Sequence, residues 1–258
     1  MKVETDIDIS AIGDSYSNAS SVQDESTSAA MLDVENKLFN TATIDMPKID
    51  ANFGYQKKPF YNFFKRFFDI FLSLLAIIAL SPVFLITMII IKCQDGGRVF
   101  FVQKRVGRNG KKFKMIKFRS MCPNAEKEIR NLLDKNEATG PMFKMKNDPR
   151  VTPFGKFIRK TSIDELPQLF NILSGSMSIV GPRPALPREA NQYNNSQKYR
   201  FLVKPGLTCI WQVSGRSNLT FSDQILMDKE YICKRNLLLD TKLIIKTIPA
   251  VVKHDGAI

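Results

Sequence analysis

The sequence predicts a mixed α/β domain that sits on one leaflet of a membrane. A re-entrant helix–break–helix and amphipathic helices in the interface would hold it there. Three observations lead to this prediction. An uncharged apolar run of 22 residues covers 70–91 and is interrupted at its centre by Ser81-Pro82. Basic residues flank the run on both sides. Strand-like and helix-like stretches follow it along the rest of the chain.

The first 56 residues differ in character from the rest of the chain. They are rich in Ser, Asp, Asn and Thr, and they carry 3 lysines against 10 acidic residues. Such a composition buries too little apolar surface to offset the entropy of ordering, so we predict a disordered acidic tail over 1–56. Residues 57–258, with 35 basic and 15 acidic residues, form the predicted domain. That charge indicates an anionic partner: nucleic acid, anionic lipid or a phosphorylated substrate.

The apolar run 70–91 is just long enough to span a bilayer core of about 30 Å. Pro82 has no N–H to give to the carbonyl of Ile78, so a break is expected there, and Ser81 can bond the freed backbone group. Basic residues on both flanks include Lys65, Arg66, Lys92 and Arg98. Because positive charge favours the cytoplasmic side, both ends are predicted to lie there. We therefore favour a re-entrant segment over an ordinary kinked spanning helix.

Downstream stretches alternate in their predicted structure. Asn109-Gly110 is a turn signal between two strand-like segments within 98–121, and Arg119 projects from the second segment. The hairpin is either a solvated basic surface near lipid headgroups or part of a substrate site. Residues 124–136 read as a short amphipathic helix, and residues 237–252 read as a helix that suits the interface.

The segment "GKFIRKTSIDELPQLFNIL" carries adjacent carboxylates, Asp164 and Glu165, at the start of a predicted helix. Ser162 with Glu165 fits a capping box, whereas an N-cap at Asp164 would make the missing N–H of Pro167 harmless. The pair either only caps the helix, or one carboxylate attacks a substrate while the other holds a cation. The second interpretation is favoured by Arg159 and Lys160 just upstream, since cations and a helix N-terminus attract phosphate.

Other residue types narrow the chemistry. His254 is the only histidine, and the four cysteines form no C-x-x-C pair, which argues against a His-activated nucleophile and against a zinc site. Catalysis would then rest on carboxylates, basic residues and a hard metal ion. Arg183 lies between Pro182 and Pro184, so its guanidinium is either pre-positioned for phosphate or part of a rigid surface turn. The later stretch "KPGLTCIWQVSGR" adds Arg216.

Five motifs in order resemble the bacterial sugar transferase family, the monotopic polyprenyl-phosphate hexose-1-phosphate transferases, also called phosphoglycosyl transferases. The resemblance covers residues 60–258. It rests on "KRFFDI…LSPV", "FFVQKRVGRNGKKFKMIKFRSM", "RKTSIDELPQLFNIL", "GSMSIVGPRP" and "KPGLTCIWQVSGRS". Cys209 departs from the pattern, because the family commonly has Gly there.

The resemblance implies an enzyme that moves a sugar 1-phosphate from a UDP-sugar to a polyprenyl (undecaprenyl) phosphate and releases UMP. Asp164 matches the nucleophile that forms a covalent aspartyl-phosphosugar, and Glu165 matches the residue that helps Asp164 to hold Mg²⁺. Arg159 and Arg183 match phosphate contacts, and Ser81-Pro82 matches the membrane break. We also assign Arg119 and Arg216 to phosphate binding. The implied location is the cytoplasmic face of the bacterial inner membrane, at the first membrane step of surface polysaccharide synthesis.

Two alternatives remain open. The "LTCIWQVSGR" version resembles members that use UDP-glucose or UDP-galactose, but the same chemistry could act on a UDP-N-acetylated amino sugar. A different class of protein, a membrane-anchored module without catalysis, would bind anionic lipid or nucleic acid through the basic body. Such a binder has no use for Asp164-Glu165, so we predict an enzyme with lipid and nucleotide-sugar partners and without a nucleic-acid partner.

Overall fold

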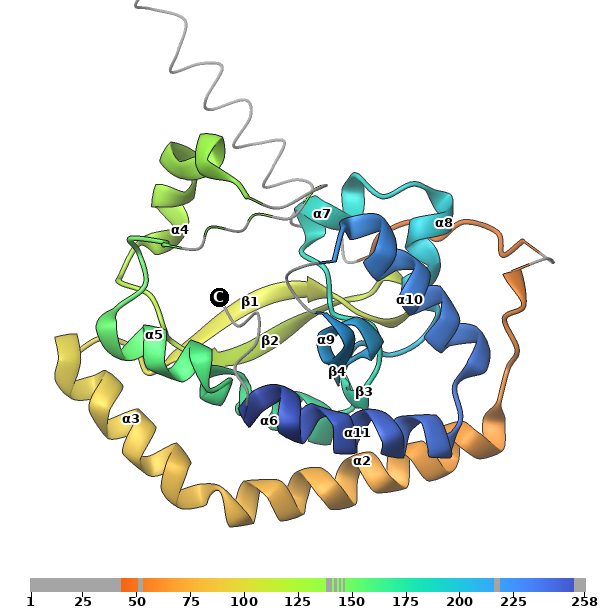
Figure 1. Ribbon diagram of the computed structural model, residues 1–258, viewed down its shortest axis with the longest axis horizontal. Coiled ribbons are helices and arrows are strands. Elements are labelled where there is room, and N and C mark those ends of the chain that lie inside the picture. The colour runs from red at the N-terminus through yellow and green to blue at the C-terminus, as the bar shows by residue number, and fades with distance from the viewer. Residues whose placement is uncertain are drawn as a thin grey trace, which may run out of the picture. The chain divides into compact units, whose positions relative to one another are not determined.

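The structure is a computed structural model that describes residues 43–50, 53–137, 141, 143, 145, 147–215 and 219–252. Helices surround two small two-stranded sheets in this part of the chain (Figure 1). The predicted mixed α/β class is therefore confirmed. Residues 1–42 of the predicted acidic tail lie outside the described residues.

The apolar run forms two helices that meet at the predicted break. Helix α2 (Pro59–Ala79) and helix α3 (Ser81–Asp95) are bent by 62° about Leu80. The Ser81 hydroxyl donates to the carbonyl oxygen of Ile78 at 2.8 Å, and Pro82 lies in the first turn of α3, where its missing N–H costs little. No single helix in the described part of the chain has the length and apolar character to cross a membrane, whereas this bent pair meets both criteria together.

Each of these two helices has one buried side. Helix α2 buries Asp69 and Ser73, and α3 buries Phe84, Thr87 and Ile91. Asp69 Oδ1 accepts from the Ile179 N–H at 2.9 Å and from the Ser178 hydroxyl at 3.1 Å, which ties α2 to the domain. The outer side of the pair exposes large apolar residues: Phe60, Phe63, Phe64, Phe67, Phe71, Ile78, Leu85, Ile86 and Ile89.

The two sheets position the centre of the domain. Strands β1 (Phe100–Val106) and β2 (Lys112–Phe118) form an antiparallel hairpin with Val106 opposite Lys112. The predicted Asn-Gly turn is confirmed, since Asn109 and Gly110 both have left-handed backbone conformations, with φ of 56° and 73°. Strands β3 (Ser178–Val180) and β4 (Gly206–Thr208) pair in parallel. A Cβ on Gly206 would lie 2.1 Å from the Gly181 nitrogen, so only glycine permits this approach.

The remaining elements are short helices around these sheets. They are η3 (Arg108–Gly110), α4 (Ala125–Glu128), η4 (Ile129–Lys135), α5 (Pro153–Lys160), η5 (Ile163–Glu165), α6 (Gln168–Leu173), α7 (Pro187–Asn191), α8 (Asn195–Lys198), η6 (Tyr199–Leu202), α9 (Ile210–Ser214), α10 (Phe221–Lys234) and α11 (Leu237–Val252). The helices predicted over 124–136 and 237–252 are thus present as α4 with η4 and as α11. The placement of α11 in a membrane interface stays a prediction.

Three apolar clusters hold these elements together. The first joins α3, β2, α5 and α6 through Phe84, Phe118, Ile158 and Ile172. The second surrounds Val106 at the end of β1, and the third lies between α10 and α11. A polar contact also ties α2 to α11, because the carboxylate of Asp240 accepts from Lys65 at 2.7 Å and from Tyr61 at 2.8 Å.

The described residues that precede α2 belong to the same compact unit as the domain. Thr43 forms a β-bridge with Lys111, the Ile44 N–H donates to Gly110 at 2.8 Å, and the side chains of Ile44 and Phe53 are buried. The predicted boundary at residue 57 is therefore too late for residues 43–50 and 53–56. Ile44 and Phe53 are isolated apolar residues in a polar stretch, so the sequence shows no helix or strand periodicity around them. In the structure Ile44 packs in the second cluster and Phe53 in the third.

Candidate active site

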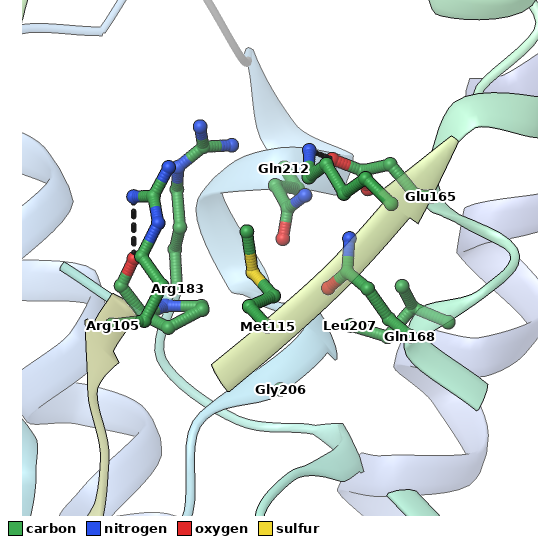
Figure 2. A pocket seen from close by; sticks show the side chains of 10 residues that line it. Arg105, Met115, Glu165, Gln168, Arg183, Gly206, Leu207 and Gln212 are labelled. Atoms are coloured by element: carbon green, nitrogen blue, oxygen red, sulfur yellow. Dashed lines mark hydrogen bonds and ion pairs between the residues drawn. The ribbon is translucent and has the colours of Figure 1, made fainter. Parts of the chain in front are cut away.

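A pocket opens where the hairpin, η5, β4, α9 and the Pro-Arg-Pro stretch meet (Figure 2). Figure 2 shows Arg105 and Arg183 side by side at one end of the pocket and Glu165 at the other, with Met115 and Gln212 between them. The full lining consists of Arg105, Met115, Lys117, Glu165, Gln168, Arg183, Pro184, Gly206, Leu207 and Gln212. These ten residues lie between positions 105 and 212, so distant parts of the chain converge on one site.

The acidic pair lies on a short turn and not in the first turn of a longer helix. Helix α5 ends at Lys160, because Ser162 adopts a left-handed conformation with φ of 57° that no helix continues through. The 3₁₀ turn η5 then carries Asp164 and Glu165, and α6 begins only at Gln168 with Pro167 as its N-cap. Both sequence-based cap assignments are therefore wrong: the Ser162 side chain makes no cap bond, and Asp164 is not an N-cap.

Lys117 on β2 holds the acidic pair. Its Nζ lies 2.6 Å from Glu165 Oε1 and 3.8 Å from Asp164 Oδ2. Burial raises the pKa of Asp164 to about 6, although the positive charge of Lys117 opposes the rise. Burial acts on Glu165 in the same direction, but Lys117 and Arg183 together outweigh it and keep the pKa of Glu165 below its ordinary value. The surroundings thus shift the pKa values of Asp164 and Glu165 in opposite directions.

Two arginines form the cationic end of the pocket. Arg183 is half-buried between two prolines, and Arg105 on β1 is buried. Arg105 Nη1 donates to the Pro184 carbonyl oxygen at 3.0 Å, so it also supports the loop that carries Arg183 (Figure 2). The Nε of Arg105 is buried without a hydrogen-bond partner. Burial, with the charge of Arg183 added, lowers the pKa of Arg105 to about 10, so the Arg105 guanidinium remains charged at neutral pH.

The other predicted phosphate contacts have different locations. Arg159 lies in the last turn of α5, close enough to lower the pKa of Asp164, but it does not line the pocket. Arg119 does not line the pocket and forms an ion pair with Asp95 at the end of α3, so its role in phosphate binding stays a prediction. Arg216 lies outside the described residues.

Several pocket residues were not predicted from the sequence, notably Arg105, Lys117, Gln168 and Gln212. A signal for two of them was present. The Asn-Gly turn fixes the hairpin register, in which Gln103 faces Met115 and Phe101 faces Lys117. Since side chains alternate along a strand, Arg105, Met115 and Lys117 must share one face of the hairpin. Gln168 and Gln212 carried no such signal, because their positions depend on tertiary packing alone.

Cys209, the departure from the family pattern, is buried beside the pocket. Its Sγ donates to Gln212 Oε1 at 3.0 Å. The thiol is thereby accommodated, and it contacts a residue that lines the site.

Among the described residues, no group of three or more His, Cys, Asp or Glu side chains could hold a metal ion. Any cation here would have to share the two carboxylates with oxygens of a substrate.

The sequence matches one protein family and several bacterial proteins. The model of the bacterial sugar transferase family matches residues 60–254. The chain is similar to the exopolysaccharide production protein ExoY of Sinorhizobium fredii, with 41% identity over 78% of this chain and 90% of ExoY. It is 42% identical to the undecaprenyl-phosphate galactose phosphotransferase of Salmonella typhimurium over 76% of this chain. A UDP-N-acetylgalactosamine-undecaprenyl-phosphate N-acetylgalactosaminephosphotransferase of Aeromonas hydrophila is 38% identical over 77% of this chain. The chain spans only 42% and 46% of the length of these last two proteins.

The contact between Lys117 and Glu165 should be energetically coupled. In a double-mutant cycle with Lys117→Met and Glu165→Gln, we expect a coupling energy of about 1–3 kcal/mol in the free energy of unfolding, because each single change leaves a partly buried charge unpaired. Denaturant unfolding in detergent measures it. The exposed pair Lys234 and Glu230, at 3.0 Å, is the matched control and should give less than about 0.5 kcal/mol. Equal coupling in the two pairs would contradict a special role for Lys117.

Proposed function

The chain belongs to the bacterial sugar transferase family, and we propose that it transfers a sugar 1-phosphate from a UDP-sugar to a polyprenyl phosphate with release of UMP. The observation that carries this proposal is the pocket in which Glu165 faces the guanidinium groups of Arg105 and Arg183. Asp164 does not line the pocket itself, but it lies next to Glu165 with its Oδ2 3.8 Å from Nζ of the lining residue Lys117. Phosphoryl transfer needs positioning and charge neutralisation more than it needs a strong base, and this pocket offers both. The names of the Salmonella and Aeromonas relatives support the same class of reaction.

Asp164 is the proposed nucleophile. Its carboxylate oxygen attacks the phosphorus that bears the sugar, the bond between the two phosphates breaks, and UMP leaves with the bridging oxygen. A polyprenyl phosphate oxygen then attacks the aspartyl phosphate, which forms the lipid diphosphate sugar and restores the carboxylate. Aspartyl phosphate is an established type of covalent intermediate. Burial of Asp164, whose side chain is only 10% exposed, keeps water away from that intermediate.

The neighbouring groups have complementary proposed roles. Arg183, fixed by its prolines, and Arg105, fixed by Pro184, bind the diphosphate of the donor. Lys117 holds Glu165 ionised, so that Glu165 and Asp164 are available to a divalent cation. Two carboxylates together with substrate phosphates and water form an oxygen donor set that fits Mg²⁺. When bound, Mg²⁺ would neutralise part of the charge that develops on the leaving phosphate.

For the donor, we propose UDP-galactose or UDP-glucose. The galactose named for the Salmonella relative supports this choice, whereas the name of the Aeromonas relative supports an N-acetylated amino sugar as the alternative. A non-catalytic module is disfavoured. Burying two adjacent carboxylates beside Lys117 costs free energy, and negative charge at this place would not help a protein that only binds anions.

We further propose that the enzyme works on the cytoplasmic face of the bacterial inner membrane, as an early step of surface polysaccharide synthesis. The support comes from α2 and α3. Their bent arrangement leaves large apolar residues on the outer side, while the inner side is fastened to the domain through Asp69 and Phe84. Helix α11, which exposes Leu238, Ile245 and Ile248, would lie in the interface beside α2.

The direct test is a panel of UDP-sugars. Membranes that carry the protein should release UMP over many turnovers only when both a polyprenyl phosphate and an accepted UDP-sugar are present, with UDP-galactose or UDP-glucose as donor. Without the polyprenyl phosphate, at most one UMP per enzyme should be released. Release from a UDP-N-acetylated amino sugar alone would select the alternative donor. No release from any member of the panel, in folded protein, would return the chain to the class of non-catalytic binders.

Arg183 should act through its planar, bidentate guanidinium. Arg183→Lys keeps the charge but loses the fork, so we expect kcat/KM to fall roughly 10-fold to 1000-fold, which corresponds to about 1.4–4 kcal/mol. The exposed Arg188 on α7 provides the control, and Arg188→Lys should leave kcat/KM within about twofold. Unchanged kinetics in Arg183→Lys would assign Arg183 to a rigid surface turn.

The membrane topology is tested by cysteine labelling. In a chain without native thiols, single cysteines at the exposed positions Lys57 and Arg98 should both react with an impermeant reagent from the cytoplasmic side only. The reason is that the bend at Ser81-Pro82 returns the chain to the leaflet it entered. Replacement of Ser81-Pro82 by Leu-Leu should shift part of the population to a spanning form. Labelling of the two positions from opposite faces of the unaltered membrane would contradict the re-entrant topology.

A further inference from the structure

A second cavity, of about 140 Å³, lies beside the first half of α2 and shares no lining residue with the active-site pocket. Tyr55, Tyr61, Asn62, Lys65, Arg66, Asp69, Arg108, Leu202, Val203, Lys204, Tyr231 and Arg235 line it. Five of these residues are basic and one is acidic. The proposed transfer reaction makes no use of them.

The basic residues of this cavity lack enough acidic partners. Among the described residues, Lys65 pairs with Asp240, but no carboxylate lies within ion-pair distance of Arg66, Arg108, Lys204 or Arg235. The acidic lining residue, Asp69, already accepts two hydrogen bonds from β3. The cavity therefore carries surplus positive charge next to an apolar helix surface.

Arg66 and Lys204 bring their charged ends to the same point. A Cβ built on Gly175 would lie 3.4 Å from Arg66 Nη2 and 3.5 Å from Lys204 Nζ, so both groups converge on this glycine. The pKa of Lys204 lies below its ordinary value because of burial and because of the charges of Arg66 and Arg108, against the opposing effect of Asp69. A bound anion would relieve this repulsion.

We propose that this cavity binds the phosphate of an anionic lipid headgroup. Phosphate matches a cluster of guanidinium and ammonium donors. A lipid is favoured over a soluble anion, because the same helix lines the cavity with Lys65, Arg66 and Asp69 and exposes Phe63, Phe67 and Phe71 on its other side. This choice of source rests on the membrane placement of α2 that is part of the proposed function. A headgroup phosphate would then lie where the apolar surface meets the basic domain.

The lipid site lies next to elements of the active site. Arg66 donates through Nη1 to the Ile172 carbonyl at 2.6 Å and through Nη2 to the Leu173 carbonyl at 2.7 Å, at the end of α6. The first residue of α6, Gln168, lines the active-site pocket. Because Arg66 thus also supports the fold, its replacement is unsuitable as a test. Lys204 and the exposed Arg108 carry charge into the cavity without an ion pair of their own among the described residues.

The test measures lipid binding to the full chain in neutral detergent by native mass spectrometry, without UDP-sugar or polyprenyl phosphate. The probes are phosphatidylglycerol, which is anionic, phosphatidylcholine, which is zwitterionic, and inorganic phosphate. We expect bound phosphatidylglycerol, at least tenfold weaker binding of phosphatidylcholine, and no displacement of phosphatidylglycerol by millimolar inorganic phosphate. Displacement by inorganic phosphate would show that the cavity takes a soluble anion and would overturn the lipid assignment.

The variant Arg108→Gln/Lys204→Gln should weaken phosphatidylglycerol binding at least tenfold, with an unfolding temperature close to that of the unaltered chain. The control variant is Lys242→Gln/Lys246→Gln, which removes two positive charges from the exposed side of α11, outside the cavity. It should bind phosphatidylglycerol as the unaltered chain does. Unchanged binding in the first variant, or an equal loss in the second, would overturn the proposal. Since no UDP-sugar is present, an enzyme that fails every donor assay could still bind the lipid, so the two failures are distinguishable.

Discussion

Burial of two adjacent carboxylates is the constraint on which the rest of this structure depends. Asp164 and Glu165 follow one another on η5, and leaving either charge buried without a partner would cost several kcal/mol. The positive charge of Lys117, 2.6 Å from Glu165, offsets most of that cost. The charges of Arg159 and Arg183 further stabilise the two carboxylates. A strand must therefore pass under η5 with a lysine in one register position. The same charges that make burial possible also attract a diphosphate, so stability and substrate binding use one set of residues.

The hairpin and the glycine contacts follow from this requirement. The Asn109-Gly110 turn sets the register that brings Arg105 and Lys117 to one face, and the Val106 N–H donates to the Ala185 carbonyl at 2.9 Å, which fixes the stretch that carries Arg183. The close backbone approach at Gly181 and Gly206 brings β4 to the pocket wall. The helix pair α2 and α3 is fastened to this assembly from one side only, and its outer side remains apolar. The reacting groups and the proposed membrane surface are thus parts of one packed unit.

Local signals predicted some of these features from the sequence, and tertiary contacts decided the others. The break at Ser81-Pro82, the Asn-Gly turn and the helix 237–252 depend on backbone chemistry within a few residues, and the structure confirms them. Neither the capping box at Ser162 nor the N-cap at Asp164 is present, because the left-handed Ser162 separates α5 from η5 and α6 begins only at Gln168. The ion pair of Arg119 with Asp95 also joins segments that no local pattern connects. Glu165, the partner of Lys117, is far from it in the chain, so no local pattern could predict the contact. The burial of Ile44 and Phe53 likewise depends on residues distant in the sequence.

The covalent role of Asp164 is the central claim, and isotope exchange tests it most directly. Enzyme and UDP-sugar, without any lipid acceptor, should exchange labelled UMP into UDP-sugar, because only a covalent half-reaction can run backwards in the absence of the acceptor. Asp164→Asn should abolish the exchange in folded protein, since a carboxamide is a poor nucleophile of nearly the same size and shape. Exchange at the wild-type rate in Asp164→Asn, or full turnover by an enzyme that shows no exchange, would contradict the account.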